Sequence, residues 1–149
     1  MYDVNMKIFY IIIYSFLLII PAKAKLKIGA KIDGKVWVID GDSLRISSND
    51  FKKYEVRIFG INAPELNTKK GKIAKTFMIK LIKKGNRKVS CKVIDIDRYK
   101  RYVSVCNSNQ GDLAEIMLKN KQAKVLTRYL HLAPQEIQEI GRASCRERV

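Results

Sequence analysis

The feature that most constrains this chain is residues 56–65, which read VRIFGINAPE. Apolar side chains alternate with other residues at its start and predict a strand, and Gly60 permits a bend near its end. Pro64 has no N–H group and restricts the residue before it to extended geometry, so strand pairing should stop there. Glu65 is therefore expected to project from a strand end, where a rigid scaffold can hold a catalytic side chain.

Two further polar segments complement this strand end. Residues 38–44 read VIDGDSL, and residues 97–101 read DRYKR. Together the three segments offer carboxylates, an amide and two arginines, which are groups that can hold a hard cation and a phosphodiester. Taken alone, each has an ordinary alternative: a tight turn at residues 40–42, a solvated loop glutamate at Glu65 and a basic hairpin turn around Arg101.

In this order, the three segments resemble the staphylococcal-nuclease (thermonuclease) family over about residues 31–129. The resemblance implies an α+β, mainly β fold, a five-stranded OB-like barrel with two to three helices. It also implies an enzyme, a nuclease that hydrolyses phosphodiester bonds.

The resemblance further implies a calcium site. Asp42 matches a metal-binding aspartate of the family, and the backbone carbonyl of Ala63 would be a bridging ligand. Asn62 stands where the family has a second aspartate. An amide oxygen can coordinate Ca²⁺, but the site loses one negative charge, so we expect weaker binding than in an Asn62→Asp variant. Asp40 is expected to shape the turn or to support Asp42.

Three residues match the catalytic groups of the family. Glu65 corresponds to the general base, or to the group that orients the attacking water. Arg57 and Arg101 correspond to the two arginines that bind phosphate and stabilise charge in the transition state. Four residues are candidates for substrate binding, through base stacking or phosphate contact: Arg98, Tyr99, Lys100 and Tyr129. Lys100 occupies a position that is usually Gly in the family.

The periodicity of the chain predicts strands and helices that agree with this fold. Strands are expected within residues 27–39, as two pieces separated by a turn or bulge at residues 33–34, and at 43–46, 54–61, 88–94 and 102–106. An apolar stripe with helical spacing predicts a helix over residues 73–82, with Gly85 as a left-handed stop. A second helix should begin after Asp112, at capping-box distance from Glu115. Pro134 would open a third helix.

Both ends of the sequence are expected to lie outside the folded domain, which we place at residues 25–138. Residues 1–24 have a lysine, a short apolar run and an Ala-x-Ala site, which predict a signal peptide cleaved after Ala24 and a secreted or periplasmic protein. An uncleaved anchor is the alternative, although the run is shorter than the roughly 20 residues that span a bilayer. Residues 139–149 fit no element and resemble a translated sequencing adapter, with a basic tail as the alternative.

The chain is strongly basic. It has 30 Lys and Arg against 14 Asp and Glu, a formal net charge of +16. Such an excess favours polyanionic partners such as DNA or RNA, although lysines on solvated faces are an ordinary alternative. No stable protein partner is implied, and we expect a monomer without membrane contact once the leader is removed.

The two cysteines of the domain, Cys91 and Cys106, fall in neighbouring predicted strands. The sequence has no C-x-x-C motif and no Cys/His cluster, so a zinc site is not expected. Export would permit a disulfide, but strand alternation groups Cys91 with Val89 and Val93 and places Cys106 with Ser104. The family pattern implies instead that both cysteine side chains point inward. We expect two buried free thiols.

The sequence thus favours an exported, calcium-dependent nuclease that cleaves DNA and RNA to 3′-phosphate products. Two alternatives remain. Asn62 favours a catalytically impaired OB-like module that only binds nucleic acid, and an uncleaved leader would give a basic protein anchored at the cell surface.

Overall fold

In the computed structural model, residues 25–126 and residue 135 are described. Five strands of this part form the barrel: β1 (Lys31–Val38), β2 (Ser43–Ser48), β3 (Lys53–Ile58), β5 (Lys88–Ile96) and β6 (Tyr102–Ser108). They follow the order β3-β2-β1-β5-β6, with antiparallel neighbours, and a parallel pairing of β3 with β6 closes the sheet. This closed, mainly β barrel confirms the predicted OB-like architecture.

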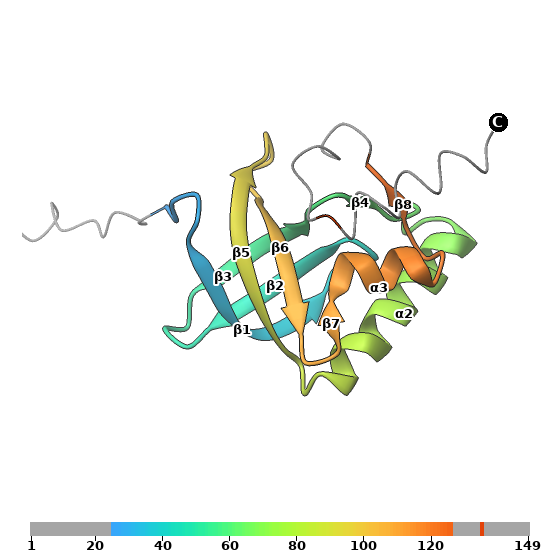
Figure 1. The fold of residues 1–149 in the computed structure, drawn as a ribbon, viewed down its shortest axis with the longest axis horizontal. Helices are drawn as coiled ribbons and strands as arrows, with labels where there is room; N and C mark the ends of the chain where they lie inside the picture. The colour runs from blue at the N-terminus through green and yellow to red at the C-terminus, as the bar shows by residue number, and fades with distance from the viewer. Residues whose placement is uncertain (1–24, 127–134, 136–149) are drawn as a thin grey trace, which may run out of the picture.

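The remaining elements flank the barrel. Helix α2 (Lys69–Lys84) joins β3 to β5 by way of the short strand β4 (Ile61–Asn62), and α3 (Leu113–Lys119) follows β6 and β7 (Gly111–Asp112). Strand β8 (Lys124–Val125) pairs with β4. Figure 1 shows both helices on one side of the barrel. Within the described residues, no helix has the length and apolar character needed to cross a membrane.

The core lies inside the barrel and beneath the two helices. Alternate residues of each strand point inward, and the helices contribute one apolar face each. The side chains with the least exposure come from the five barrel strands, from both helices and from the short strand β4: Ile32, Leu44, Ile46, Val56, Ile58, Ile61, Met78, Cys91, Val93, Leu113 and Met117. The Asp112 side chain accepts from the Glu115 N–H at 2.9 Å, so the predicted cap of the second helix is confirmed.

Three local predictions were wrong. Residues 33–34 form no turn or bulge, because β1 continues through Gly34, where a Cβ would lie 2.1 Å from the Ser47 carbonyl oxygen. Gly85 ends α2 with φ of −83°, while Asn86 and Arg87 take the left-handed conformation at 54° and 55°. Ile73, the first residue of the apolar stripe that predicted a helix over residues 73–82, is 51% exposed, since the inward face of α2 is completed by Gly71, Ala74 and Met78.

The prediction of free thiols was also wrong. Cys91 and Cys106 form a disulfide that crosses from β5 to β6, where the two residues lie directly opposite each other. Both side chains are buried. The alternation argument failed for Cys106 because Ser104, with which it shares a face, is itself fully buried.

Several predictions fall outside the described residues. These are the leader at residues 1–24, the third helix after Pro134 except for residue 135, the segment 139–149 and the candidate base-stacking residue Tyr129.

Candidate active site

Asp42 stands at the end of the turn that leads into β2, and it is 5% exposed. The turn is held by the Asp40 carboxylate, which accepts from the Asp42 N–H at 3.0 Å. The Asp42 carboxylate accepts from the Ser43 hydroxyl at 2.9 Å and from the Ala63 N–H at 2.9 Å. This last bond ties the residues before Pro64 to the β1–β2 turn, so two of the three predicted segments meet at one carboxylate.

The electrostatics of Asp42 reflect this burial. Removal from water raises the pKa of the Asp42 carboxyl above its ordinary value. The hydrogen bond from the Ala63 N–H and the positive charge of Arg57 favour the ionised form and offset part of that effect. Asp42 therefore depends on nearby positive charge, from Arg57 or from a bound cation.

Arg57 supplies that charge from β3, where it is paired in register with Ser43 of β2. One terminal nitrogen of its guanidinium donates to Asp42 at 3.0 Å, and the other donates to the Asn62 side-chain oxygen at 3.0 Å. The second nitrogen also reaches the Ile61 carbonyl at 3.4 Å. The predicted metal ligands Asp42 and Asn62 are thus bridged by one predicted phosphate-binding arginine.

Arg101 comes from the turn between β5 and β6 and meets the same cluster. Its guanidinium lies 3.5 Å from the Ser43 hydroxyl, which in turn donates to Asp42. Its Nε donates to the Asp97 carboxylate at 2.8 Å. All three predicted segments are therefore connected through hydrogen bonds.

Asp97 organises the turn that carries Arg101. Its carboxylate accepts from the N–H groups of Tyr99 and Arg101, both at 2.9 Å, besides the ion pair with the Arg101 side chain. Partial burial alone would raise the pKa of Asp97, but the bonds from the Arg101 N–H and guanidinium outweigh it and lower the pKa. Lys100, at the position that is usually Gly in the family, takes φ of 65° and so keeps the turn.

Replacing Asp97 with asparagine should weaken this turn. An amide oxygen can still accept hydrogen bonds, but the charge that pairs with Arg101 is lost, and we expect a cost of about 2 kcal/mol at neutral pH. Because the folded-state pKa is lowered, the contribution of Asp97 is present above the ordinary pKa of an aspartate and is lost as the pH falls through the folded value. Urea unfolding at neutral and acidic pH measures the difference between the two proteins. A difference that stays constant into the acid range would contradict this role.

A hollow of about 570 Å³ opens beside the two arginines. Among its lining residues are Arg57, Asp97, Arg98, Tyr99 and Arg101. The guanidinium carbons of Arg98 and Arg101 lie 4.9 and 5.4 Å from the centre of the Tyr99 ring, which is itself exposed. The structure thus places an aromatic ring among cations at the edge of the candidate site, an arrangement that suits a base and its phosphate.

Glu65 lies near the cluster in sequence but is not bonded to it. Its side chain is exposed, and within the described residues its carboxylate takes part in no hydrogen bond or ion pair. Its backbone carbonyl accepts from Thr68, the N-cap of α2, and packs so closely on Gly71 that a Cβ there would lie 1.9 Å away. Gly71 therefore lets the loop that carries Glu65 rest on the first turn of α2.

The oxygen atoms near Asp42 that could bind a metal fit a largely hydrated calcium ion. An oxygen acceptor has two lone pairs, so the carboxylate oxygen that faces Ala63 and the Asn62 oxygen each retain one. Calcium accepts carboxylate, amide and backbone oxygens and completes its shell with water. The set carries one formal negative charge, from Asp42, and residues 25–126 and 135 contain no cluster of three or more Asp, Glu, His or Cys side chains suited to a metal.

Comparison with known proteins agrees with this geometry. Residues 55–146 match the family described as staphylococcal nuclease homologue, more than half of the chain. The chain belongs to the staphylococcal nuclease family. The match includes Arg57, Asn62, Glu65 and Arg101, whereas Asp42 precedes it.

Two relatives come from Oryza sativa subsp. japonica. "Probable staphylococcal-like nuclease CAN2" is 42% identical over 72 residues, which make up 48% of this chain and 19% of that protein. "Probable staphylococcal-like nuclease CAN3" is 39% identical over 72 residues, with the same coverage. The aligned segment thus spans about a fifth of each staphylococcal-nuclease relative.

Sequence reasoning missed two residues of the site in this family member. Ser43 links Asp42 to Arg101, and Asp97 fixes the turn that presents Arg101. A signal for Asp97 was present, because an aspartate at the start of a turn can accept from the backbone N–H groups that follow it. Ser43 gave no comparable signal, because its contact with Arg101 depends on the pairing of β2 with β3 and of β3 with β6.

Proposed function

We propose that this staphylococcal-nuclease-family protein is an exported, calcium-dependent nuclease that hydrolyses DNA and RNA phosphodiesters to 3′-phosphate products. The observation that carries the proposal is the Arg57 guanidinium, which bridges Asp42 and Asn62 at 3.0 Å each. A module that only binds nucleic acid has no need to gather a buried carboxylate, an amide and two arginines beside one hollow.

In this proposal the chain positions the scissile phosphate. Arg57 has five N–H groups and makes three hydrogen bonds to described residues, so two remain for phosphate oxygens. Arg101 adds donors from the neighbouring turn. Both contacts strengthen as charge accumulates on the phosphorus oxygens in the transition state. Arg98, Tyr99 and Lys100 would hold the flanking nucleotide, and Tyr129 is proposed to stack on a base.

Calcium, held by Asp42, Asn62 and the Ala63 carbonyl, would polarise a phosphate oxygen and lower the pKa of a bound water. Glu65 is proposed to accept the proton of the attacking water, since its exposed carboxylate is free of other partners among the described residues. The water oxygen bonds to phosphorus and the bond from phosphorus to the 5′ oxygen breaks. The 5′ oxygen takes a proton from solvent water and leaves as a hydroxyl, and the phosphate stays on the 3′ side. The test of this role is the Glu65→Gln variant, which keeps the shape of the side chain and should abolish most calcium-dependent cleavage.

Export is proposed from two features. Residues 1–24 have the pattern of a cleaved signal peptide, and the Cys91–Cys106 disulfide is of a kind that persists in oxidising compartments. The mass of the mature protein tests this, with Lys25 expected as the first residue. A mature chain that retains residues 1–24 would support an anchored protein instead.

A second function, nucleic-acid binding without cleavage, is favoured by Asn62. With an amide in place of a carboxylate, Asp42 is the one carboxylate among the three proposed calcium ligands, and Arg57 already pairs with it. In that case the same hollow would bind a strand and leave it intact.

The Asn62→Asp variant distinguishes the two functions. Adding a carboxylate to the cluster should tighten calcium binding by about tenfold, because a charged oxygen ligand replaces a neutral one. Cleavage of single-stranded DNA is measured against free calcium, with a chelator as the blank. Cleavage by the unaltered chain establishes a nuclease that uses an amide ligand, and cleavage by Asn62→Asp alone identifies a disarmed site. Binding without cleavage by both proteins would overturn the nuclease proposal.

A further inference from the structure

The outer face of β1 and β5 carries like charges directly opposite one another. Lys31 is in register with Lys92, and Lys35 with Lys88, with Asp33 and Ser90 between the two pairs. All four lysines are exposed, and within residues 25–126 none of them forms an ion pair. Like charges directly opposite across two strands are destabilising. The paired lysines therefore lower the stability of the free protein, and a bound polyanion would neutralise them.

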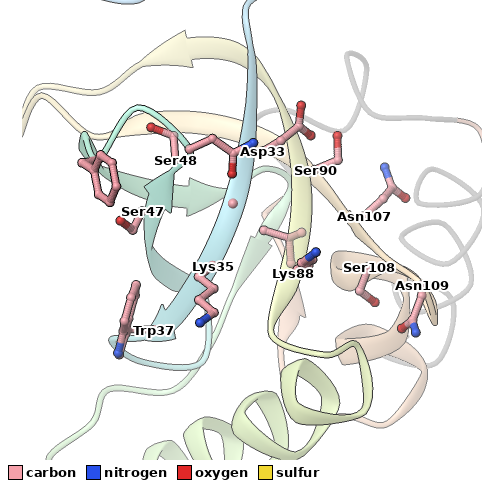
Figure 2. Close-up of a pocket in the computed structure, with 14 residues that line it drawn as sticks. Asp33, Lys35, Trp37, Ser47, Ser48, Lys88, Ser90, Asn107, Ser108 and Asn109 are labelled. Atoms are coloured by element: carbon pink, nitrogen blue, oxygen red, sulfur yellow. The ribbon is translucent and has the colours of Figure 1, made fainter.

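The same face is hollowed and rimmed by aromatic rings. A cavity of about 740 Å³ is lined by residues that include Lys35, Lys88, Trp37 and Phe51. Figure 2 shows Lys35 and Trp37 on β1 and Lys88 on the neighbouring strand around this hollow. Trp37 is 53% exposed and Phe51 is 90% exposed. A single exposed aromatic needs no explanation, but two beside a lysine-lined hollow form a stacking platform.

This hollow lies two strands along the sheet from the candidate active site. Arg57 of β3 is in register with Ser43 of β2, and two residues further along β2, Arg45 is in register with Trp37 of β1. Two strand spacings and two residues of rise separate Arg57 from Trp37, roughly 12 Å. The lining residues of the two hollows do not overlap. A strand held at Arg57 can therefore reach the second hollow by crossing β2.

We propose that this surface, which we call the Trp37 surface, binds a single-stranded segment of the substrate beyond the nucleotides at the cleavage site. Trp37 and Phe51 stack on unpaired bases, and Lys35 and Lys88 contact phosphates. The inference rests on the proposed function for its substrate class, because the strand it holds is the one that continues from Arg57. Single strands fit better than duplex, since stacking on an aromatic side chain requires a base that is free of its neighbours.

The first test uses the intrinsic fluorescence of the full chain, which contains a single tryptophan. The protein is titrated in a chelator with a single-stranded oligonucleotide of about 12 nucleotides, and separately with a dinucleotide. We expect the longer strand to quench Trp37 and the dinucleotide, which occupies the cleft at Arg57, to leave it unchanged. Equal emission with and without the longer strand would overturn the proposal. So would a response to phosphatidylserine vesicles but not to the oligonucleotide.

The second test removes the two phosphate contacts. Lys35→Gln with Lys88→Gln should weaken binding of the longer strand about tenfold and reduce the slope of log K against log salt by about 1.4, two contacts at 0.7 each. The matched control, Lys80→Gln with Lys83→Gln, makes the same charge change on exposed positions of α2. An equal loss in both variants would show that net charge alone drives binding and would overturn the proposal.

Stability and cleavage separate this inference from the proposed function. Because Lys35→Gln with Lys88→Gln removes a like-charge pair, the midpoint of thermal unfolding of this variant should not fall. If the chain binds the longer strand at Trp37 but never cleaves it, the proposed function fails while the Trp37 surface stands. If it cleaves with calcium but Trp37 never responds, the Trp37 surface fails while the proposed function stands.

Discussion

Replacing Arg57 with glutamine should reduce calcium-dependent cleavage by about 10²–10³-fold, corresponding to roughly 2.7–4 kcal/mol of transition-state stabilisation. Two effects act together. The phosphate loses a charged donor, and the buried Asp42 carboxylate loses the cation that offsets its burial. The measurement is kcat/KM for single-stranded DNA at saturating calcium, with thermal unfolding followed in parallel to separate activity from folding.

Two further variants sharpen this prediction. Arg57→Lys keeps the positive charge but cannot bridge Asp42 and Asn62 with a planar fork, so it should remain folded and still be slow. Arg87→Gln makes the same change at an exposed residue after α2 that lines neither hollow, and should leave activity nearly intact. Comparable losses in Arg87→Gln and Arg57→Gln would contradict a specific role for Arg57.

The largest expected effect on stability comes from the Cys91–Cys106 disulfide. The two cysteines are 15 residues apart, and a cross-link of that length stabilises a fold by about 3 kcal/mol through the entropy of the unfolded chain. The bridge also joins two strands of the closed barrel in its core. Reducing the protein should therefore lower its free energy of unfolding by about this amount, as measured by urea unfolding with and without reductant.

The control for this prediction is the double variant Cys91→Ala with Cys106→Ala. It should be less stable than the oxidised protein and should not respond to reductant, which separates the cross-link from the loss of packed sulfur atoms. Identical unfolding of the oxidised and reduced unaltered chain would show that the bridge contributes nothing. That result would also remove one of the two supports for export.

The fold class and most of the elements could be predicted from the amino-acid sequence. Period-two and helical patterns located the five barrel strands and both helices, and Asp112 with Glu115 marked the start of α3. These features are local, because capping and alternation depend on residues a few positions apart. The three polar segments likewise indicated the family, to which residues 55–146 belong.

How those segments meet could be learned only from the three-dimensional arrangement of the strands. The disulfide and the bond from Arg57 to Asp42 depend on the register between paired strands, and the link from Ser43 to Arg101 joins residues that are 58 positions apart. The lysine pairs on β1 and β5 could not be seen in the sequence for the same reason. A one-residue change of register turns each side chain to the other face of a sheet. Alternation therefore predicts which residues share a face but not which of them face each other.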